Sequence, residues 1–184
     1  MSVYSTILSH KQQSAKLLAI LIDPDKEKVY LPLLSKLKQA DLVFVGGSTG
    51  ENVEPCIAML REHTNAPLII FPGNASQFSP QADALLFLTL LNARTADMLI
   101  EPHVQMAIPI HKSGIEAIPM GYILIDGGRK SSVEIVSNCD PIPQSEVGRI
   151  VSTAIAGQLL GKQLIYLEAG SEAKTPVSSD IICA

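Results

Sequence analysis

Six apolar runs recur along the chain, and glycine, proline, aspartate or asparagine separates them. Within a run the apolar residues follow one another without polar alternation, which is typical of strands that are covered on both faces. The pattern therefore predicts a parallel sheet. Its strands are expected at residues 17–23, 42–48, 67–73, 84–90, 118–126 and 163–170.

Segments with helical periodicity separate several of the predicted strands. Their apolar residues return every three or four positions, with polar residues on the opposite face. These helices are predicted in residues 26–40, 51–64 and 145–160. Strands that alternate with helices form right-handed βαβ units, so we expect a barrel or a doubly wound sheet.

Two segments depart from this alternation. Residues 93–112 are expected to make a poor helix, because Pro102 and Pro109 would break or kink it. Residues 127–144, with the sequence GGRKSSVEIVSNCDPIPQ, are expected to form a long loop with at most a short strand pair.

The composition indicates one cytoplasmic domain. With 184 residues, 47% of them hydrophobic, the chain has the material for a single core over residues 1–184. A net charge of -4 argues against a nucleic-acid partner, whose binding surface would be basic. No apolar run approaches the roughly 18 residues of a transmembrane segment, and the N-terminal sequence does not resemble a signal peptide.

The cysteines and histidines show no spacing typical of a metal cluster. Cys56, Cys139 and Cys183 are odd in number and far apart, so they are expected to be buried free thiols. His103 and His111 are near each other in the sequence, but the prolines around them spoil a common helical face. Surface or packing roles are the more favoured interpretation of these histidines.

Polar residues close five of the predicted strands. The carboxyl ends of parallel strands meet at one edge of a sheet, where loops and helix N-termini bind ligands. The residues are Asp23, Ser48, Asn92, Asp126 and Glu168. We therefore expect these side chains to gather on a single rim.

The first two strand ends indicate a metal and phosphate site. Asp23, in LIDPDK, offers a hard oxygen to Mg²⁺, which takes one or two protein carboxylates and completes its shell with water and substrate phosphate. Asp25 is interpreted as the N-cap of the next helix. The loop GGSTGENVE brings the amides of Gly46 and Gly47 and the hydroxyl of Ser48 to a helix start. Such a loop occurs in many folds, but it gains weight beside a strand-end aspartate.

Five segments together resemble the geranylgeranylglyceryl phosphate synthase family, which also contains the bacterial heptaprenylglyceryl phosphate synthases. They are LIDPDK, VGGSTG, IPMGYILIDGG, PIP and YLEAGS, in this order over nearly the whole chain. The resemblance implies a modified TIM barrel, a (β/α)₈ fold. It also implies a Mg²⁺-dependent enzyme that joins a polyprenyl diphosphate, geranylgeranyl in this branch, to the 3-hydroxyl of sn-glycerol 1-phosphate, which makes an ether lipid precursor.

The resemblance also implies roles for individual residues. Asp23 and Ser48 fall on the metal positions, and Gly46, Gly47 and Tyr122 fall near the prenyl diphosphate. Glu168 would receive the hydroxyl proton of glycerol phosphate or orient that hydroxyl, with Tyr166 beside it. The ring of Tyr122 could stabilise the allylic cation, although core packing explains it equally well. The glycerol phosphate loop comprises Tyr166, Leu167, Glu168, Ala169, Gly170 and Ser171.

The sequence departs from the family pattern in two places. Glu172 replaces a glycine of the loop, so it would weaken phosphate binding unless it points to solvent or Lys174 neutralises it. The sequence also ends where the family continues into a seventh and an eighth strand, so the last two βα units of the barrel are expected to be absent. Barrels of this family self-associate, and an open sheet edge favours a homo-oligomer further.

Two other functions stay open at this level. A sugar-phosphate isomerase or aldolase would need a Schiff-base lysine or an opposed acid and base, and no lysine closes a predicted strand. A catalytically impaired barrel fragment that acts as a phosphate-binding or assembly module would explain Glu172 and the missing strands. The length of the prenyl donor is not determined by the sequence.

Overall fold

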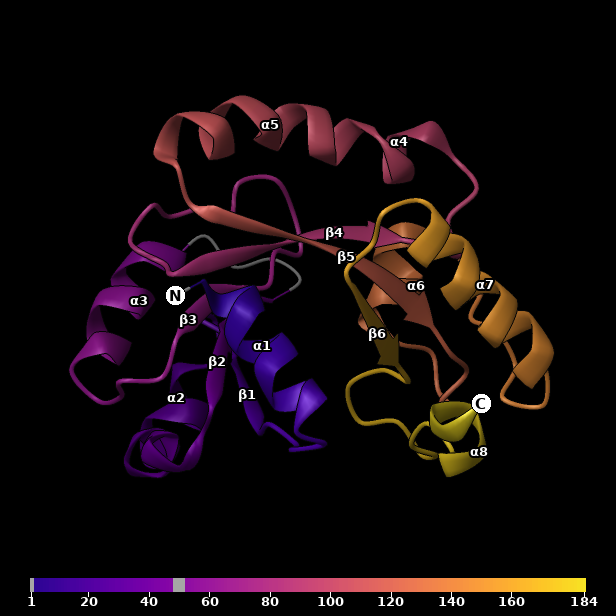
Figure 1. Cartoon of the computed structure of the whole chain (residues 1–184), viewed down its shortest axis with the longest axis horizontal. Helices are drawn as coiled ribbons and strands as arrows, with labels where there is room; N and C mark the ends of the chain where they lie inside the picture. Colours follow the sequence, from indigo (N-terminus) through magenta and orange to yellow (C-terminus); the bar gives the residue numbers. More distant parts are fainter. Residues whose placement is uncertain (1, 48–51) are drawn as a thin grey trace. The chain divides into compact units, whose positions relative to one another are not determined.

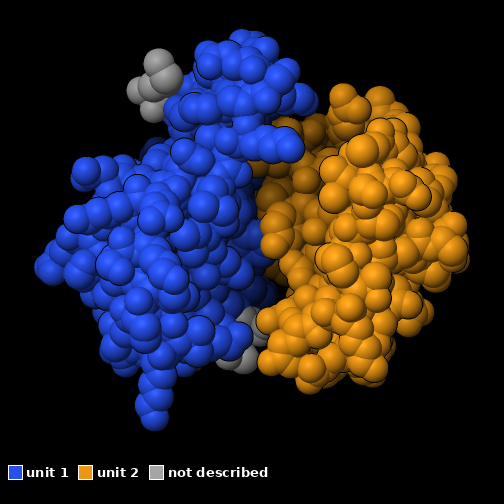
Figure 2. All heavy atoms as spheres, turned by 90° about the horizontal axis from the view of Figure 1, so that it is seen from below, with its two compact units in different colours: residues 1–86, 105–118 blue, residues 87–104, 119–184 orange. Residues whose placement is uncertain are grey.

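The protein forms two compact units in the computed structural model, which describes residues 2–47 and 52–184. Figure 2 shows the units in separate colours. The first unit holds residues 1–86 and 105–118, and the second holds residues 87–104 and 119–184. The expectation of one domain over residues 1–184 stays a prediction.

Over residues 2–47 and 52–184 the sheet has six strands, and their order in the sheet is their order in the chain (Figure 1). Each strand overlaps a predicted apolar run, and the β1·β2, β2·β3, β3·β4 and β5·β6 pairs are parallel. The strands are β1 (Ala19–Ile22), β2 (Leu42–Val45), β3 (Leu68–Ile70), β4 (Ala84–Leu90), β5 (Glu116–Leu124) and β6 (Leu164–Glu168). The predicted parallel sheet is thereby confirmed for these pairs.

The core of the first unit lies between the strands and the helix α3 (Val53–Arg61). The three residues of β3 are completely buried, as expected of a central parallel strand. The helix buries Val53, Cys56, Ile57 and Leu60, whose spacing is that of one helical face. The periodicity of residues 51–64 therefore predicted both this helix and its buried side.

The predicted helix over residues 26–40 is interrupted. A short α-helix, α2 (Glu27–Tyr30), continues into the 3₁₀-helix η1 (Leu31–Gln39). Pro32 explains the change, because it has no amide hydrogen to donate and its ring would clash with the carbonyl four residues earlier. The tighter 3₁₀ turn keeps Leu37 fully buried.

The sequence did not predict the N-terminal helix α1 (Val3–Gln12). Only Val3 is buried in it, so it has almost no apolar face to detect. Its start is held by a distant carboxylate, since Glu116 accepts hydrogen bonds from the amides of Val3 (2.6 Å) and Tyr4 (3.0 Å). Such a tertiary cap satisfies amides that no earlier turn can reach.

In the core of the second unit, β5 packs against the helix α7 (Val147–Leu159). The sequence predicted this helix. Ile123 and Ile125 from the β5 segment pack with Ile142 and Ile150. Just beyond β4, the buried side-chain amide of Asn92 bonds to the backbone of β5. Its Nδ2 donates to the carbonyl of Leu124 and its Oδ1 accepts from the amide of Leu124, both at 2.9 Å. Both polar atoms of the Asn92 side chain are therefore bonded to the backbone of the protein.

Helices replace both irregular segments that the sequence predicted. The α5 helix (Glu101–Ser113) follows the short α4 (Ala96–Leu99) and continues through Pro109. Pro102 stands in the first turn, where an amide hydrogen is not needed, so it does not break the helix. Among the described residues, no helix is long and apolar enough to cross a membrane.

The stretch 127–144 is likewise not a simple loop, because it contains α6 (Ser132–Ser137). A capping box starts this helix: Ser131 accepts from the amide of Glu134 at 3.1 Å, and the carboxylate of Glu134 accepts from the amide of Ser131. This Ser-x-x-Glu signal was present in the sequence and was overlooked. A last short helix is α8 (Ser179–Cys183).

The three cysteines are free thiols, as predicted, but their burial differs. Cys56 and Cys139 are buried, whereas Cys183 is exposed. The prediction of burial was wrong for Cys183, because it lies in the last turn of α8, where Ile181 is the residue that faces the core. Burial raises the pKa of Cys56 to about 11, despite a hydrogen bond with Tyr30 that acts in the opposite direction.

A chain of polar side chains connects α5 to the loop before β6 within the second unit. Lys162 Nζ donates to Thr89 Oγ1 at 2.6 Å, and the same hydroxyl lies 2.9 Å from His103 Nε2. The ring of His103 also meets Phe87 edge-on at 4.6 Å. Burial lowers the pKa of His103, the charge of Lys162 lowers it further, and hydrogen bonds to backbone carbonyls oppose both effects.

This arrangement predicts that acid destabilises the fold through His103. A lowered pKa means that the unfolded chain binds the proton more readily, so the free energy of unfolding falls as pH drops below about 6.5 and is level above it. The His103→Gln variant is expected to lose this part of the pH dependence, at most about 1.4 kcal/mol per pH unit. Urea unfolding between pH 5 and pH 8 measures it.

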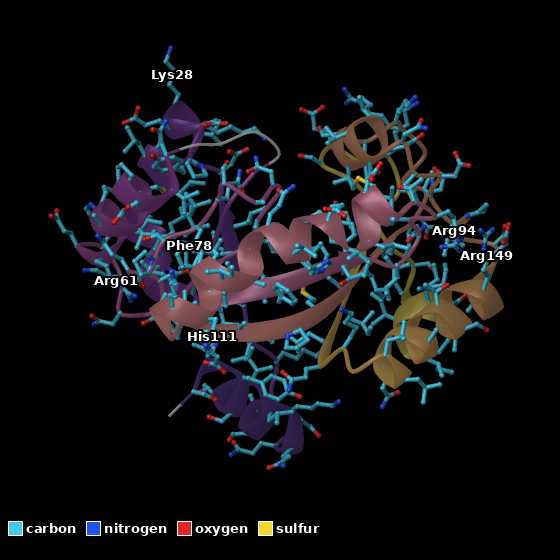
Figure 3. The ribbon with its side chains drawn as sticks, turned by 90° about the horizontal axis from the view of Figure 1, so that it is seen from above. Lys28, Arg61, Phe78, Arg94, His111 and Arg149 are labelled. Carbon is cyan, nitrogen blue, oxygen red and sulfur yellow. The ribbon has the colours of Figure 1, made fainter. Side chains whose placement is uncertain are left out.

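The matched control is His111→Gln, which changes an exposed histidine on the same helix (Figure 3). This variant is expected to keep the pH dependence of the wild type. Equal slopes for the wild type and His103→Gln would contradict the assignment.

Candidate active site

Asp23 directly follows β1, and its carboxylate organises the turn after that strand. Oδ1 accepts from the amide of Asp25 at 3.1 Å, and Oδ2 lies 3.2 Å from Lys26 Nζ. The helix α2 starts only at Glu27, with Lys26 in the N-cap position and no side-chain cap. The interpretation of Asp25 as the N-cap was therefore wrong, because the intervening turn belongs to Asp23.

Gly46 and Gly47 follow β2 and lie against the end of β1. The amide of Gly46 donates to the carbonyl of Ile22 at 3.0 Å. A methyl group on Gly47 would lie 2.6 Å from Asp23 Cγ, and one on Gly46 would overlap the carbonyl oxygen of Phe71. At Gly46 the obstacle is backbone, so only glycine fits there, whereas at Gly47 it is the Asp23 side chain, and the absence of a Cβ lets the backbone lie against that carboxylate. Ser48 and Gly50 lie outside the described residues.

Gln77 is a buried residue of this region that the sequence did not single out. Its Nε2 donates to the carbonyl of Gly47 at 2.8 Å, and its Oε1 accepts from the amide of Gly73 at 2.8 Å. It stands in the polar stretch GNASQFSP, where nothing in the pattern distinguishes a buried amide from an exposed one. Only its complete burial reveals it.

Glu168 is the last residue of β6 in the second unit. Its Oε1 accepts from the amide of Gly170 at 2.7 Å, which fixes the carboxylate above the turn that follows. In the strand register Tyr166 pairs with Tyr122, and the two rings are 5.4 Å apart. The second unit thus gathers Tyr122, Tyr166 and Glu168 at the ends of neighbouring strands.

The two tyrosines surround this carboxylate as neutral phenols. Burial raises the pKa of Tyr166, and the negative charge of Glu168 and a hydrogen bond to it act in the same direction. Burial also raises the pKa of Tyr122, with further contributions from Glu168 and Tyr166. Each hydroxyl therefore keeps its proton at neutral pH. The hydrogen bond between Tyr166 and Glu168 ties the phenol hydroxyl to the carboxylate.

The loop after β6 depends on glycine for its shape. Gly170 has a φ of +97°, which side chains rarely tolerate, and a methyl group there would lie 2.8 Å from Ser131 Cβ. Leu167 points into the core of the second unit, whereas Ser171 is exposed. The carbonyl of Ala169 lies so close to Gly127 that a methyl group on Gly127 would overlap it.

Glu172, the departure from the family pattern, points to solvent. Its side chain is 72% exposed and forms an ion pair with Arg129. We expected solvent exposure or neutralisation by Lys174, and the structure provides exposure with Arg129 as the partner. Lys174 instead donates its backbone amide to Gly127 at 2.9 Å. Glu172 therefore directs no uncompensated charge at the loop.

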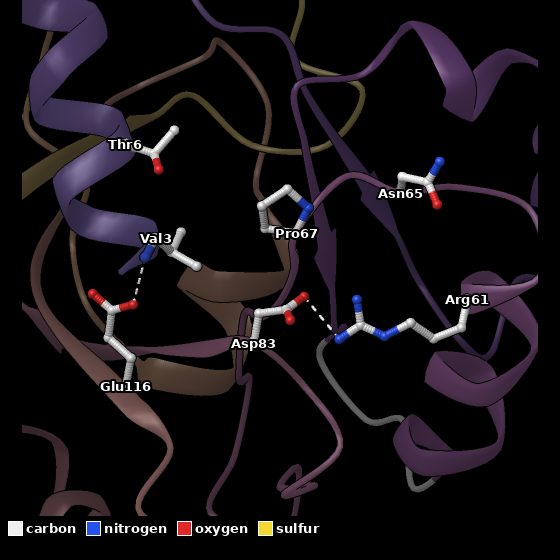
Figure 4. A pocket seen from close by; sticks show the side chains of 7 residues that line it. All are labelled: Val3, Thr6, Arg61, Asn65, Pro67, Asp83 and Glu116. Carbon is white, nitrogen blue, oxygen red and sulfur yellow. Dashed lines mark hydrogen bonds and ion pairs between the residues drawn. The ribbon is translucent and has the colours of Figure 1, made fainter. Parts of the chain in front are cut away.

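A separate polar pocket of about 250 Å³ lies at the starts of β3, β4 and β5 in the first unit (Figure 4). Three of its charged side chains, Arg61, Asp83 and Glu116, already bind other groups of the protein. Asp83 forms an ion pair with Arg61 at 2.8 Å and accepts from the amide of Leu68, and Glu116 holds the start of α1. The pocket lies at the amino ends of the strands. In folds of this type residues on that face serve stability, and active sites lie at the opposite, carboxyl face.

The sequence pattern of the PcrB family matches residues 10–183. The chain belongs to the PcrB family. Its relatives include the geranylgeranylglyceryl phosphate synthase of Flavobacterium johnsoniae, 46% identical over 98% of this chain and 77% of the relative. The enzyme of the same name from Zunongwangia profunda is 43% identical over 98% of this chain and 79% of its own length. The resemblance found in the sequence is confirmed.

Two solved structures of similar sequence share the fold. That of (S)-3-O-geranylgeranylglyceryl phosphate synthase from Thermoplasma acidophilum, in complex with its substrate sn-glycerol-1-phosphate, matches with a TM-score of 0.87 at 31% identity. Wild-type GGGPS from Thermoplasma volcanium also matches with a TM-score of 0.87, at 30% identity. Both comparisons cover 99% of this chain and 75% of the other. The predicted TIM-barrel-like α/β fold is confirmed, and the chain spans three quarters of those barrels.

Proposed function

We propose that this chain is a prenyltransferase that joins geranylgeranyl diphosphate to the 3-hydroxyl of sn-glycerol 1-phosphate. Relatives at 46% and 43% identity carry the name of this activity, and a structure with the same fold binds sn-glycerol-1-phosphate. The observation that carries the proposal is the end of β6. There Glu168 is held by Gly170 and by Tyr166, beside a loop that only glycine can shape.

Glu168 supplies the base of the reaction. The carbon–oxygen bond of the allylic diphosphate breaks, the glycerol 3-oxygen forms a new bond to that carbon, and the hydroxyl proton passes to the carboxylate. Diphosphate leaves with the electron pair of the broken bond. A positioned carboxylate contributes about a hundredfold or more to such a step. The hydrogen bonds from Gly170 and Tyr166 hold Glu168 in one orientation.

Asp23 is the described residue that fits a divalent cation. It is a carboxylate at a strand end, and the bare backbone of Gly47 leaves no side chain over it. Mg²⁺ needs only one or two protein carboxylates, because water and substrate phosphates complete its shell. When bound, the ion would neutralise charge on the departing diphosphate. Lys26, paired with Asp23, adds a second positive group on the same turn.

The proposal predicts an ether product that depends on a divalent cation. The whole chain is incubated with labelled sn-glycerol 1-phosphate, geranylgeranyl diphosphate and about 5 mM Mg²⁺. A millimolar concentration is chosen because Mg²⁺ binds weakly where only one or two carboxylates hold it. We expect the labelled ether in the organic phase, and we expect EDTA to abolish it and added Mg²⁺ to restore it. Farnesyl and longer donors in parallel reactions would define the donor length.

Absence of the ether from fully folded protein would contradict the proposal. If the chain still bound sn-glycerol 1-phosphate in calorimetry, the result would favour an impaired barrel that acts as a phosphate-binding module. An aldolase is less favoured, because Lys26, the lysine near a strand end, is engaged with Asp23. Self-association and a cytoplasmic location stay predictions, and gel filtration of the same preparation tests the first.

A further inference from the structure

Gln77 carries the largest polar side chain among the completely buried polar residues described in the first unit, the other being Ser79. It lies between β3 and β4, outside any helix or strand, and its exposed fraction is 0%. A buried amide is unfavourable unless its donor and acceptor are both used. Such a residue in a connecting segment therefore needs a specific explanation.

The amide of Gln77 links the segments that follow β2 and β3. It donates to Gly47 O and accepts from Gly73 N, and both distances are 2.8 Å. One end of the side chain must donate and the other must accept. A carboxamide has this property, a carboxylate does not, and a protonated carboxylic acid has it again.

The bond to Gly47 fixes the surface on which Asp23 rests. The backbone of Gly47 is in contact with the Asp23 carboxylate, since a methyl group at Gly47 would lie 2.6 Å from Asp23 Cγ. On the other side Gly46 is tied to β1 through Ile22. Gln77 thus links the segment after β3 to the backbone of Gly47, which in turn lies against the Asp23 carboxylate.

We propose that Gln77 is a positioning residue, which holds the Gly47 backbone in place and so fixes the carboxylate of Asp23 for a metal diphosphate. This inference rests on the proposed function. Loss of the amide would leave the carbonyl of Gly47 without its buried donor, and the segment would shift to find another. The expected result is a displaced Asp23 and weaker use of Mg²⁺, with the glycerol phosphate loop of the second unit unchanged.

The test compares Gln77→Met with Gln81→Met. Gln81 lies four positions later and is exposed, and its Nε2 donates to Glu54 Oε1 on the surface at 2.8 Å. In Gln77→Met we expect the Mg²⁺ concentration for half-maximal activity to rise about tenfold, as for a group misplaced by less than 1 Å. The KM for sn-glycerol 1-phosphate is expected to stay within about twofold of the wild type, as expected when a remote contact is untouched. Gln81→Met is expected to match the wild type in both.

A readout that does not need activity is the ¹³C signal of the Asp23 carboxyl group in NMR. It should move in Gln77→Met and stay in place in Gln81→Met. An unmoved signal in a folded Gln77→Met protein would overturn the inference. An inactive wild type would contradict the proposed function alone, because the signal of Asp23 would still decide the role of Gln77.

Gln77→Glu adds a test by chemical rescue. Burial raises the pKa of a carboxyl group at such a site, so the side chain would be protonated in mild acid and ionised in base. At about pH 6 the neutral acid can both donate to Gly47 and accept from Gly73, and the Mg²⁺ requirement should approach that of the wild type. At about pH 8 it should rise again, by more than in Gln77→Met. A requirement that does not change with pH would count against the hydrogen-bonding role.

Discussion

Glu168→Gln is expected to lower kcat of prenyl transfer at least about a hundredfold, the usual contribution of a positioned general base. The amide keeps the size of the side chain and can still accept the hydrogen bond from Gly170. It cannot take the hydroxyl proton of glycerol phosphate. The KM for sn-glycerol 1-phosphate is therefore expected to change little, since the loop keeps its shape.

Steady-state kinetics with the labelled donor measure this effect, and Glu172→Gln is the matched control. Glu172 is a carboxylate four positions later that points to solvent and pairs with Arg129. Removing its charge is expected to leave kcat within about twofold, as for surface charges whose interactions are weak. A Glu168→Gln enzyme with wild-type kcat would exclude Glu168 as the base. A large loss in both variants would point to the charge of the loop rather than to proton transfer.

Gly47→Ala is expected to remove most of the activity without unfolding the protein. The added methyl group would occupy the space of the Asp23 carboxylate, which is a side chain and can rotate away. Stability should then fall only modestly. A displaced metal ligand should lower kcat/KM for geranylgeranyl diphosphate by on the order of a hundredfold, the usual effect of a displacement of about 1 Å.

The neighbouring glycine provides a contrast. In Gly46→Ala the methyl group would overlap the backbone carbonyl of Phe71, which cannot rotate away, so loss of the fold is expected. Gly148→Ala is the neutral control, because nothing lies within 4 Å of that position on α7. Circular dichroism and urea unfolding separate these cases. Wild-type kinetics in a folded Gly47→Ala protein would contradict the role of Asp23.

The positions of the strands could be predicted because each strand leaves a continuous apolar run. The expected cover on both faces does not hold for every strand: β3 is wholly buried, whereas β1 buries only Ile22 and β6 has no buried residue. Each of β1 to β6 overlaps a continuous apolar run, and the buried face of α3 follows from its periodicity. The places of Asp23 and Glu168 at strand ends could be predicted as well, and their chemical roles stay predictions. A polar residue that closes an apolar run must lie at the edge of the sheet.

Other features depended on partners far away in the chain. The start of α1 is capped locally by Ser2, which accepts from the amide of Ser5, and also by Glu116, more than a hundred positions later, of which the sequence near α1 carries no sign. Pro109 suggested a break in α5 that did not occur, because the price of one lost hydrogen bond is smaller than the gain from the packed helix. Local propensity alone could not decide either case.

The sequence by itself determined the parallel α/β class, the strand ends that carry Asp23 and Glu168, and the family. The tertiary structure decided what lies against these carboxylates: the Gly47 backbone, bonded in turn to Gln77, beside Asp23, and the Gly170 amide and Tyr166 beside Glu168. The physical reason is that periodicity records only whether a position is buried. The partner of a buried polar atom depends on how distant segments meet, and that is fixed only when the chain folds.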